Sequence, residues 1–519
     1  MTEIATDRVV IVGAGLAALY AALKLAPRPV LMISPEPLGQ GASSAWAQGG
    51  VAAAMDPRDS ADAHADDTVR AGAGTVDAGI AQLVTDEARA HILDLTTLGT
   101  PFDRTPEGGY VMSREAAHSI ARVVRVKGDQ AGAEIMRALI AAVRDTPSVQ
   151  VLEGRIATGL VTGAGRVTGI RIARAEGSQP VTITAPAVLL AGGGSGGLYA
   201  VTTNPPRIRG QVIGMAARAG AVIADAEFVQ FHPTAIDCGE DPAPLATEAL
   251  RGEGAHLVNR RDERFMLAIH PDAELAPRDV VARAVYAQSQ AGLRPVLDTR
   301  ACLGPRILSE FPAVAAACAR AGIDPASQPI PVAAAAHYHM GGVAVDARGR
   351  ASLAGLWVAG EASSTGLHGA NRLASNGLLE ALVFARICAL GIGAALGPLA
   401  DAPPLTLPDL PPAPLPDPAL VARLRRAMTD GAGVVRDAGG LRRALAEIAT
   451  VEAAQPDCET LLNMSATATL ICAAALTREE SRGAHFRSDF PDPAPTARRS
   501  RMTLDEARAI RDALHPEVT

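Results

Sequence analysis

The stretch Arg8-Val-Val-Ile-Val-Gly-Ala-Gly-Leu-Ala-Ala18 decides the fold class of this chain. Its apolar run predicts a buried strand over 8–12, its glycines a tight turn over 13–18, and the Ala/Leu-rich residues that follow a helix over 19–25. A second apolar run, Val30–Ser34, predicts the next strand. Glycines between a strand and a helix let the backbone approach a pyrophosphate, which binds at the helix N-terminus. The pattern therefore predicts an α/β, Rossmann-like dinucleotide-binding domain.

The end of the second predicted strand favours FAD over NAD. An NAD-binding domain usually places an acidic ribose ligand there, but this chain has Ser34, with Glu36 two residues on. The loop Ser43-Ser-Ala-Trp-Ala-Gln-Gly-Gly50 has small residues that could lie against a flat ring. Far along the chain, Gly366-Leu-His-Gly-Ala-Asn-Arg-Leu-Ala-Ser-Asn376 follows Gly360-Glu361. One cofactor held from both sides explains these distant signals together.

A second glycine-rich loop follows another predicted strand. The buried run Ala187–Ala191 ends in Gly192-Gly-Gly-Ser-Gly-Gly197, which suits a nucleotide site at the carboxyl edge of a sheet. Simple loop flexibility is the alternative explanation. Upstream, residues 129–145 have the spacing of a helix, and 149–152 and 167–173 that of strands.

The rhythm of strands and helices predicts several domains in the 519 residues. Residues 1–235 and 341–397 would form a discontinuous FAD-binding domain, and 236–340, which lack this rhythm, an inserted α+β capping domain for the substrate. Nine prolines make 398–418 a stiff linker. Residues 419–519 would form a C-terminal helical bundle, with helices over 420–428, 441–454, 460–477 and 504–514.

Composition excludes several functional classes. The net charge of −7 with no basic run argues against nucleic acid as a partner. The six cysteines form no CxxC pair, so neither a zinc site nor another metal site is expected, and a reducing, cytoplasmic compartment is the default. The N-terminus is not basic, as a signal peptide would be. The longest apolar stretch, 378–396, contains Glu380 and Arg386, so no membrane span is expected.

Histidines and arginines gather in glycine-flanked polar motifs. The histidines are His232, His337 and His368, and the arginines are Arg251, Arg278 and Arg372. Arginine donates to a carboxylate through a bidentate fork, so this set predicts a site that grips a small dicarboxylate. Each residue alone could instead be an ordinary salt-bridged side chain.

The motifs, taken in order, resemble the succinate dehydrogenase and fumarate reductase flavoprotein superfamily over nearly the whole chain. They are His232-Pro-Thr234, Arg251-Gly-Glu-Gly254, Pro277-Arg-Asp-Val-Val-Ala-Arg283, His337-Tyr-His-Met-Gly-Gly342, Gly360-Glu361 and Leu367–Asn376. Within this superfamily the chain is similar to the L-aspartate oxidase family. The deciding segments are Ser113-Arg-Glu-Ala-Ala-His-Ser119, Thr247-Glu-Ala-Leu-Arg251 and Arg478-Glu-Glu-Ser-Arg482.

The resemblance implies a set of cofactor-binding residues, to which the strand ends add Ser34 and Gly192. The pyrophosphate would be held by Gly13, Ala14, Gly15, Leu16 and Ala17, and the isoalloxazine by Ser43, Ser44, Ala45, Trp46, Ala47, Gln48, Gly49 and Gly50. Ile156 would bind adenine, Glu361 a ribitol or ribose hydroxyl, and Ser375, Asn376, Gly377 and Leu378 the pyrimidine edge. Respiratory relatives attach FAD through a histidine in the loop matching 43–50. This loop has none, so non-covalent FAD is expected.

The same resemblance implies substrate residues. His232, Thr247, His337 and Arg372 would hold the carboxylates, with Gln230 and Arg251 nearby, and Arg278 would transfer a proton. A free arginine is too weak an acid for this role, so a relay with neighbouring carboxylates is required. Glu115 falls where the aspartate oxidases place an acidic residue near the substrate ammonium, which favours aspartate over succinate.

The activity implied is FAD-dependent oxidation of L-aspartate to iminoaspartate, with O2, giving H2O2, or fumarate as electron acceptor. This is the first step of NAD biosynthesis, and a quinolinate synthase would accept the product. A soluble fumarate reductase or succinate dehydrogenase flavoprotein is the rival enzyme, and a flavin-binding electron carrier without its own substrate is the alternative outside enzymes. One departure concerns the cofactor: Gly210-Gln-Val212 stands where the family commonly has Gly-Asp-Gly, so an acidic flavin contact is lost or altered.

Overall fold

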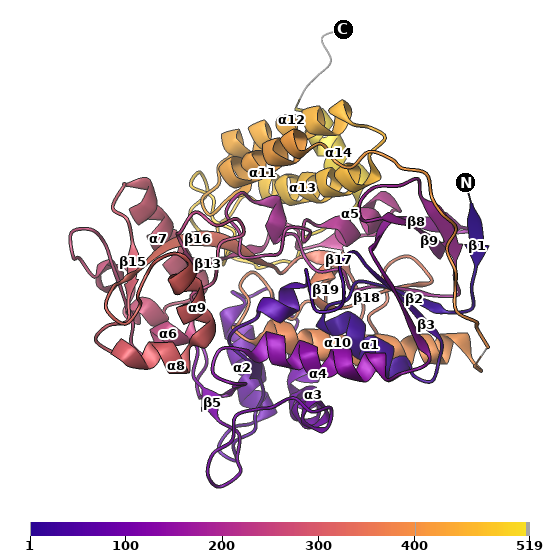
Figure 1. Cartoon of the computed structure of the whole chain (residues 1–519). Coiled ribbons are helices and arrows are strands. Elements are labelled where there is room, and N and C mark those ends of the chain that lie inside the picture. The colour runs from indigo at the N-terminus through magenta and orange to yellow at the C-terminus, as the bar shows by residue number, and fades with distance from the viewer. Residues whose placement is uncertain (1, 400, 515–519) are drawn as a thin grey trace.

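The computed structural model describes residues 2–399 and 401–514 and confirms the predicted α/β fold class. Its centre is a five-stranded parallel sheet (Figure 1). The strands, in spatial order, are β18 (Leu356–Val358), β11 (Val188–Leu190), β2 (Val9–Val12), β3 (Val30–Ser34) and β7 (Val149–Glu153). The inner strands β2, β3 and β11 are buried along their whole length, which is why they are continuous apolar runs in the sequence.

Helices cover one face of this sheet. In Figure 1, α1 (Leu16–Leu25), α4 (Ala131–Arg144) and α10 (Asn376–Leu396) lie side by side beneath the strands. Two further helices, α2 (Ala61–Ala71) and α3 (Ala78–Thr97), extend this layer, and α3 packs against α10. Helix α1 follows β2 after the glycine turn, as predicted, but it begins at Leu16, before the predicted start at Leu19.

Smaller sheets surround the centre. One has the order β1 (Glu3–Ala5), β10 (Val181–Thr184), β9 (Arg166–Arg174) and β8 (Arg155–Gly163). A second has the order β19 (Ser363–Ser364), β17 (Gly342–Ala344), β12 (Ile223–Ala224) and β20 (Arg501–Met502). A third has the order β4 (Val51–Ala52), β6 (Val123–Val124) and β5 (Met112–Ser113), and helix α5 (Gln211–Arg218) packs near β8 and β17.

The capping layer is an antiparallel sheet with its own helices. Its order is β13 (Val229–Ile236), β16 (Ile330–His339), β15 (Val296–Asp298) and β14 (His256–Val258), and its helices are α6 (Ala249–Gly252), α7 (Arg278–Gln290), α8 (Ile307–Glu310) and α9 (Pro312–Arg320). Because β13 pairs with β16, the sheet begins at Val229, before the predicted boundary at 236. Gln230 and His232 therefore lie on a strand of this layer.

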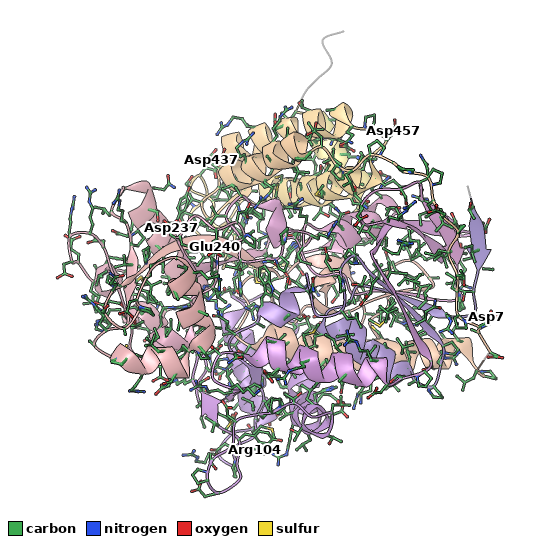
Figure 2. All side chains as sticks on the ribbon, in the orientation of Figure 1. Asp7, Arg104, Asp237, Glu240, Asp437 and Asp457 are labelled. Atoms are coloured by element: carbon green, nitrogen blue, oxygen red, sulfur yellow. The ribbon has the colours of Figure 1, made fainter. Side chains whose placement is uncertain are left out.

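The proline-rich stretch leads to the C-terminal bundle. The Arg8 guanidinium donates to the carbonyls of Ala402 and Pro403, so this stretch is anchored to the start of β2. The bundle consists of α11 (Pro418–Ala432), α12 (Ala438–Ala454), α13 (Glu459–Thr477) and α14 (Leu504–Asp512), close to the four predicted helices. Charged side chains such as Asp437, Asp457 and Arg104 project from the surface (Figure 2).

Two helices, α10 and α13, are long and apolar enough to cross a membrane. In the fold, 56% of the most apolar window of α10 and 78% of that of α13 are buried inside the protein. A helix in the core of a protein can have the same length and apolar composition as a membrane span. These two properties of α10 and α13 are therefore weak evidence for a membrane span.

Candidate active site

A single cavity of about 980 Å³ lies at the carboxyl ends of the parallel strands and extends to the capping layer. Small-molecule sites typically span about 300–1,000 Å³, so there is room for a large ligand. Its wall includes nearly all predicted cofactor residues, namely Gly13–Ala17, Ser34, Ser43–Gly50, Ile156, Gly192, Glu361, Ser375, Gly377 and Leu378. The same wall includes Glu115, His232, Thr247, Arg278, His337 and Arg372. Tertiary structure thus joins the two predicted sites into one.

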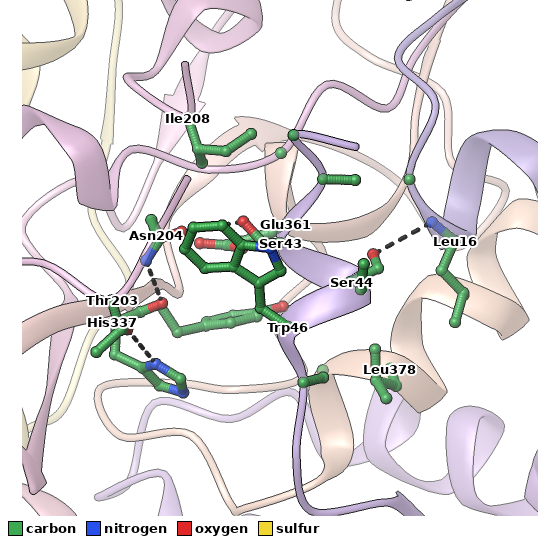
Figure 3. Close-up of a pocket in the computed structure, with 18 of the residues that line it drawn as sticks. Leu16, Ser43, Ser44, Trp46, Thr203, Asn204, Ile208, His337, Glu361 and Leu378 are labelled. Carbon is green, nitrogen blue, oxygen red and sulfur yellow. Dashed lines mark hydrogen bonds between the residues drawn. The ribbon is translucent and has the colours of Figure 1, made fainter. Parts of the chain in front are cut away.

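The glycine turn approaches a neighbouring strand closely. Gly13 has a φ of 120°, and a Cβ there would overlap the carbonyl of Ala191. Helix α1 begins at Leu16 after Gly15, which provides no side-chain cap. The Leu16 N–H accordingly donates to the Ser44 hydroxyl, 3.2 Å away (Figure 3). An N-terminus with N–H groups at a cavity wall is suited to a pyrophosphate.

The second glycine loop makes room for its neighbours. A Cβ on Gly192 would lie 2.5 Å from Val212, one on Gly194 2.6 Å from the Glu361 carboxyl carbon, and one on Gly196 2.8 Å from Cγ of Asn204. Close packing, rather than flexibility, thus explains these glycines. Gln211, which stands in place of the family's acidic residue, and its neighbour Val212 both line the cavity, and Gln211 Nε2 donates to the carbonyl of Thr460.

The loop 43–50 has an aromatic ring at the cavity and a polar atom without a hydrogen-bond partner. Ser43–Trp46 forms a short 3-10 turn with no buried residue, and the Trp46 ring lies across the cavity (Figure 3). Gln48 donates to the carbonyl of Leu245 at 2.8 Å, whereas its buried Oε1 has no partner among the described residues. A buried acceptor without a partner costs free energy, so this atom fits a ligand that donates a hydrogen bond.

Helix α10 reaches the cavity from the other side. Ser375 precedes the helix in a left-handed conformation, with φ of 63°, and Gly377 and Leu378 line the wall. Asn376 is buried outside the wall, where it bonds to His64 at 2.8 Å and to Thr68 at 2.9 Å. The structure thus gives Asn376 a contact with α2, not a place at the cavity.

Acidic groups at the cofactor end differ in their surroundings. Glu361 accepts from the backbone of His339 at 2.9 Å, and burial raises its pKa to about 7. Glu36 also lines the cavity, where it forms an ion pair with Arg207. No sequence motif predicted Arg207 or this ion pair. The residues present fit FAD: a helix N-terminus for the pyrophosphate, a loop without bulk on Gly49 and Gly50, and polar atoms along the wall.

Two histidines face each other at the substrate end. The ring centroids of His232 and His337 are 4.9 Å apart, and burial and the nearby Arg278 hold both pKa values well below 6.5. The backbone N–H of Thr234 donates to Nδ1 of His232, at 3.2 Å. Neutral His232 therefore carries its hydrogen on Nε2 and can donate it to a carboxylate.

A buried chain of charges lies beside them. Arg278 donates from Nε to Glu248, and Arg251 donates to the same oxygen at 3.1 Å. Burial alone would raise the pKa of Glu248, but the two guanidinium groups hold it at about 2. Arg278 also donates to Gln230 at 3.2 Å. Glu248 and Arg278 line the cavity, whereas Gln230 and Arg251 stand in the layer behind it.

Glu115 lies between the charged residues Glu248 and Arg278 and the 43–50 loop. It is buried, accepts from the Ser375 hydroxyl at 2.9 Å, and faces Gly49 closely. Burial, followed by the negative charge of Glu248, raises its pKa. A cationic ligand next to Glu115 would stabilise the ionised form of this carboxyl group.

Arg372 has free hydrogen-bonding capacity in the cavity wall. Its guanidinium lies over the Tyr338 ring, 4.5 Å from the centroid, and burial lowers its pKa to about 10. Its Nε has no partner among the described residues. His368, by contrast, is outside the wall and bonds to Glu380 at 2.9 Å. Four further residues of the site were not predicted from the sequence, namely Thr203, Asn204, Tyr338 and Glu248, although Glu248 is next to Thr247 in the motif Thr247–Arg251.

Within the described residues, 2–399 and 401–514, no three His, Cys, Asp or Glu side chains are grouped to hold a metal ion. All six cysteines are free.

Comparisons with known proteins agree with this geometry. Residues 8–378 match the family described as FAD binding domain, and residues 421–512 match that described as fumarate reductase flavoprotein C-term. E. coli quinol fumarate reductase FrdA has a similar structure, with a TM-score of 0.84 and 26% identity over 95% of this chain and 93% of that one. The fold and the site define an FAD-dependent flavoprotein of the succinate dehydrogenase and fumarate reductase class.

Curated relatives narrow the class. The L-aspartate oxidase of Caulobacter vibrioides is 55% identical over 500 residues, covering 96% of each chain. That of Streptomyces coelicolor is 40% identical and covers 99% of this chain and 94% of its own. The chain belongs to the L-aspartate oxidase family.

Proposed function

We propose that the chain oxidises L-aspartate to iminoaspartate with non-covalently bound FAD, and transfers the electrons to O2, giving H2O2, or to fumarate. The observation that carries this is Glu115, which lies in the same cavity as the His232, His337 and Arg372 side chains. A ligand with two carboxylates and one ammonium matches this distribution of charge. Succinate, which has no ammonium, would match the residues that bind carboxylates but would leave Glu115 without a partner.

The cofactor would be held by the α1 N-terminus, the 43–50 loop, Glu361 and the start of α10. When bound, FAD supplies the acceptor for the two electrons that leave the substrate. The loop contains no histidine, which supports non-covalent attachment.

The side chains of the substrate end perform binding and proton transfer. Arg372, the Nε2 hydrogen of His232 and the His337 ring orient the carboxylates, and Glu115 orients the ammonium. Oxidation of the ammonium form removes one hydride and one proton to give the iminium ion, and loss of a second proton gives the imine. The Glu248 carboxylate, in direct contact with Arg278 and Arg251, takes the Nε hydrogen of Arg278, and Arg278 thereby becomes able to accept the proton from the substrate. Removal of either partner of this relay would leave a buried charge unpaired.

Steady-state kinetics test the proposal. Purified protein, reconstituted with FAD, should produce H2O2 from L-aspartate and oxidise succinate with a much lower kcat/KM when a dye replaces O2. A preference for succinate would instead identify a soluble succinate dehydrogenase or fumarate reductase flavoprotein.

We further propose a cytoplasmic location and a quinolinate synthase as the enzyme that consumes the product. Six free cysteines are in keeping with a reducing compartment. Iminoaspartate hydrolyses readily in water, so a consuming enzyme in the same compartment is required. Cell fractionation with an antibody against the chain tests the location.

A further inference from the structure

Residues 202–204 form a short segment between the 43–50 loop and strand β16. The Thr202 hydroxyl and the Thr203 N–H both donate to the carbonyl of Ala336, each at 3.0 Å. The Asn204 N–H in turn donates to the Thr202 hydroxyl at 3.1 Å. These bonds fix the segment to the strand that carries His337.

The Asn204 side chain uses both ends of its amide. Its Oδ1 accepts from the Ser43 hydroxyl at 3.2 Å, and its Nδ2 donates to the carbonyl of His337 at 2.8 Å. The two partners set the orientation of the amide, because a carbonyl can only accept. Asn204 is buried, and only a glycine at position 196 leaves space for it.

The neighbouring Thr203 holds the ring of the same histidine. Its hydroxyl lies 2.8 Å from Nδ1 of His337 (Figure 3). Thr203 and His337 both line the cavity. Because Nδ1 of His337 bonds to Thr203, Nε2 is the ring nitrogen left for a ligand. One segment therefore sets both the backbone and the ring of His337, and it is bonded to the loop that faces the flavin.

We propose that Asn204 is a positioning residue that couples the 43–50 loop to His337, so that FAD and the dicarboxylate strengthen each other's binding. This rests on the function proposed above. A ligand that orders the loop also orders Ser43, and through Asn204 the main chain of His337. Because a coupling free energy is reciprocal, a dicarboxylate that orders His337 must raise the affinity for FAD by the same factor.

The experiment is a fluorescence titration of apo-protein with FAD, without and with saturating succinate. The ratio of the two FAD Kd values is the coupling factor, which in allosteric systems is about 5–150. Ser43→Ala removes one hydrogen bond of the connection and should lower the factor to roughly a fifth of the wild-type value. Adding Ser43→Ala to Asn204→Ala should change nothing further, since Asn204→Ala already removes the connection.

Ser44→Ala is the matched control. It deletes the same hydroxyl one residue along, but that hydroxyl bonds to Leu16, so FAD affinity should change while the coupling factor does not. Wild-type coupling retained in Ser43→Ala, or a factor of one in the wild type, overturns the inference. Failure of wild type to bind FAD or succinate at all would instead contradict the proposed function.

Discussion

Arg278 donates from Nε to Oε2 of Glu248 inside the protein, and both side chains reach the wall of the substrate cavity. The contact joins an arginine on α7 to a carboxylate just before α6. An isolated arginine keeps its proton at neutral pH. Direct contact with a carboxylate gives Arg278 a partner for the proton transfer that oxidation of an amine requires.

The first prediction concerns this contact. Arg278→Leu should leave the flavin absorbance spectrum unchanged but lower L-aspartate turnover by roughly a hundredfold or more, the range for loss of an acid–base group. Arg283→Leu, further along α7, is the control for helix packing and should retain most activity. Turnover of Arg278→Leu within about threefold of wild type would assign Arg278 a structural ion pair only.

Glu115 tests the choice of substrate. A charged hydrogen bond to the ammonium contributes roughly 1.5–3 kcal/mol, so Glu115→Gln should lower kcat/KM for L-aspartate about ten- to a hundredfold. Inhibition by succinate should be unchanged or stronger, because a repelling charge has gone. Glu240→Gln makes the same chemical change in an exposed carboxylate of the cavity mouth and should be neutral. Equal weakening of both ligands would mean that Glu115 supports the fold and does not bind the amine.

Protonation of Glu115 should appear in the pH dependence. Burial and the charge of Glu248 raise the pKa of this carboxyl, so it becomes neutral at a higher pH than an ordinary glutamate. An ammonium binds the ionised form. KM for L-aspartate should therefore rise as the pH falls through this raised pKa, and the inhibition constant of succinate should not follow. Parallel pH profiles for the two ligands would contradict the assignment.

Attachment of FAD can be tested directly. Acid precipitation should leave the yellow colour in the supernatant, because the 43–50 loop has no histidine to form a covalent link. Flavin that remains with the pelleted polypeptide would show a covalent bond elsewhere.

Glu361 should affect stability with a defined sign. Burial raises its pKa from 4.5 to about 7, so the folded apo-protein binds a proton that the unfolded chain has lost between these values. The free energy of unfolding should therefore fall as the pH rises from about 4.5 to 7, by on the order of 3 kcal/mol for this group. Glu361→Gln cannot ionise, and the difference between wild type and variant in urea titrations should show this slope. A difference independent of pH would mean that Glu361 is ionised throughout.

Local pattern was sufficient for the first strand, the glycine turn and the helices of the C-terminal bundle. Strand β3 ends at Ser34 as predicted, and the bundle helices begin and end within a few residues of their predicted bounds, apart from the longer α11. These elements are determined by apolar periodicity and by glycine and proline, which act over a few residues. The motifs also identified the family, because their order along the chain is itself a sequence property.

Tertiary structure alone decided which of the motif residues meet. His368 and Asn376 stand in the same motif as Arg372, yet their partners Glu380 and His64 hold them outside the cavity. Glu248 is in the wall because α6 places it beside Arg278, a residue 30 positions away. A hydrogen bond forms between atoms about 3 Å apart whatever their separation in sequence, so spacing along the chain cannot predict it. The sequence determined the fold and the kind of cofactor, and packing of the capping layer on the sheet determined the site.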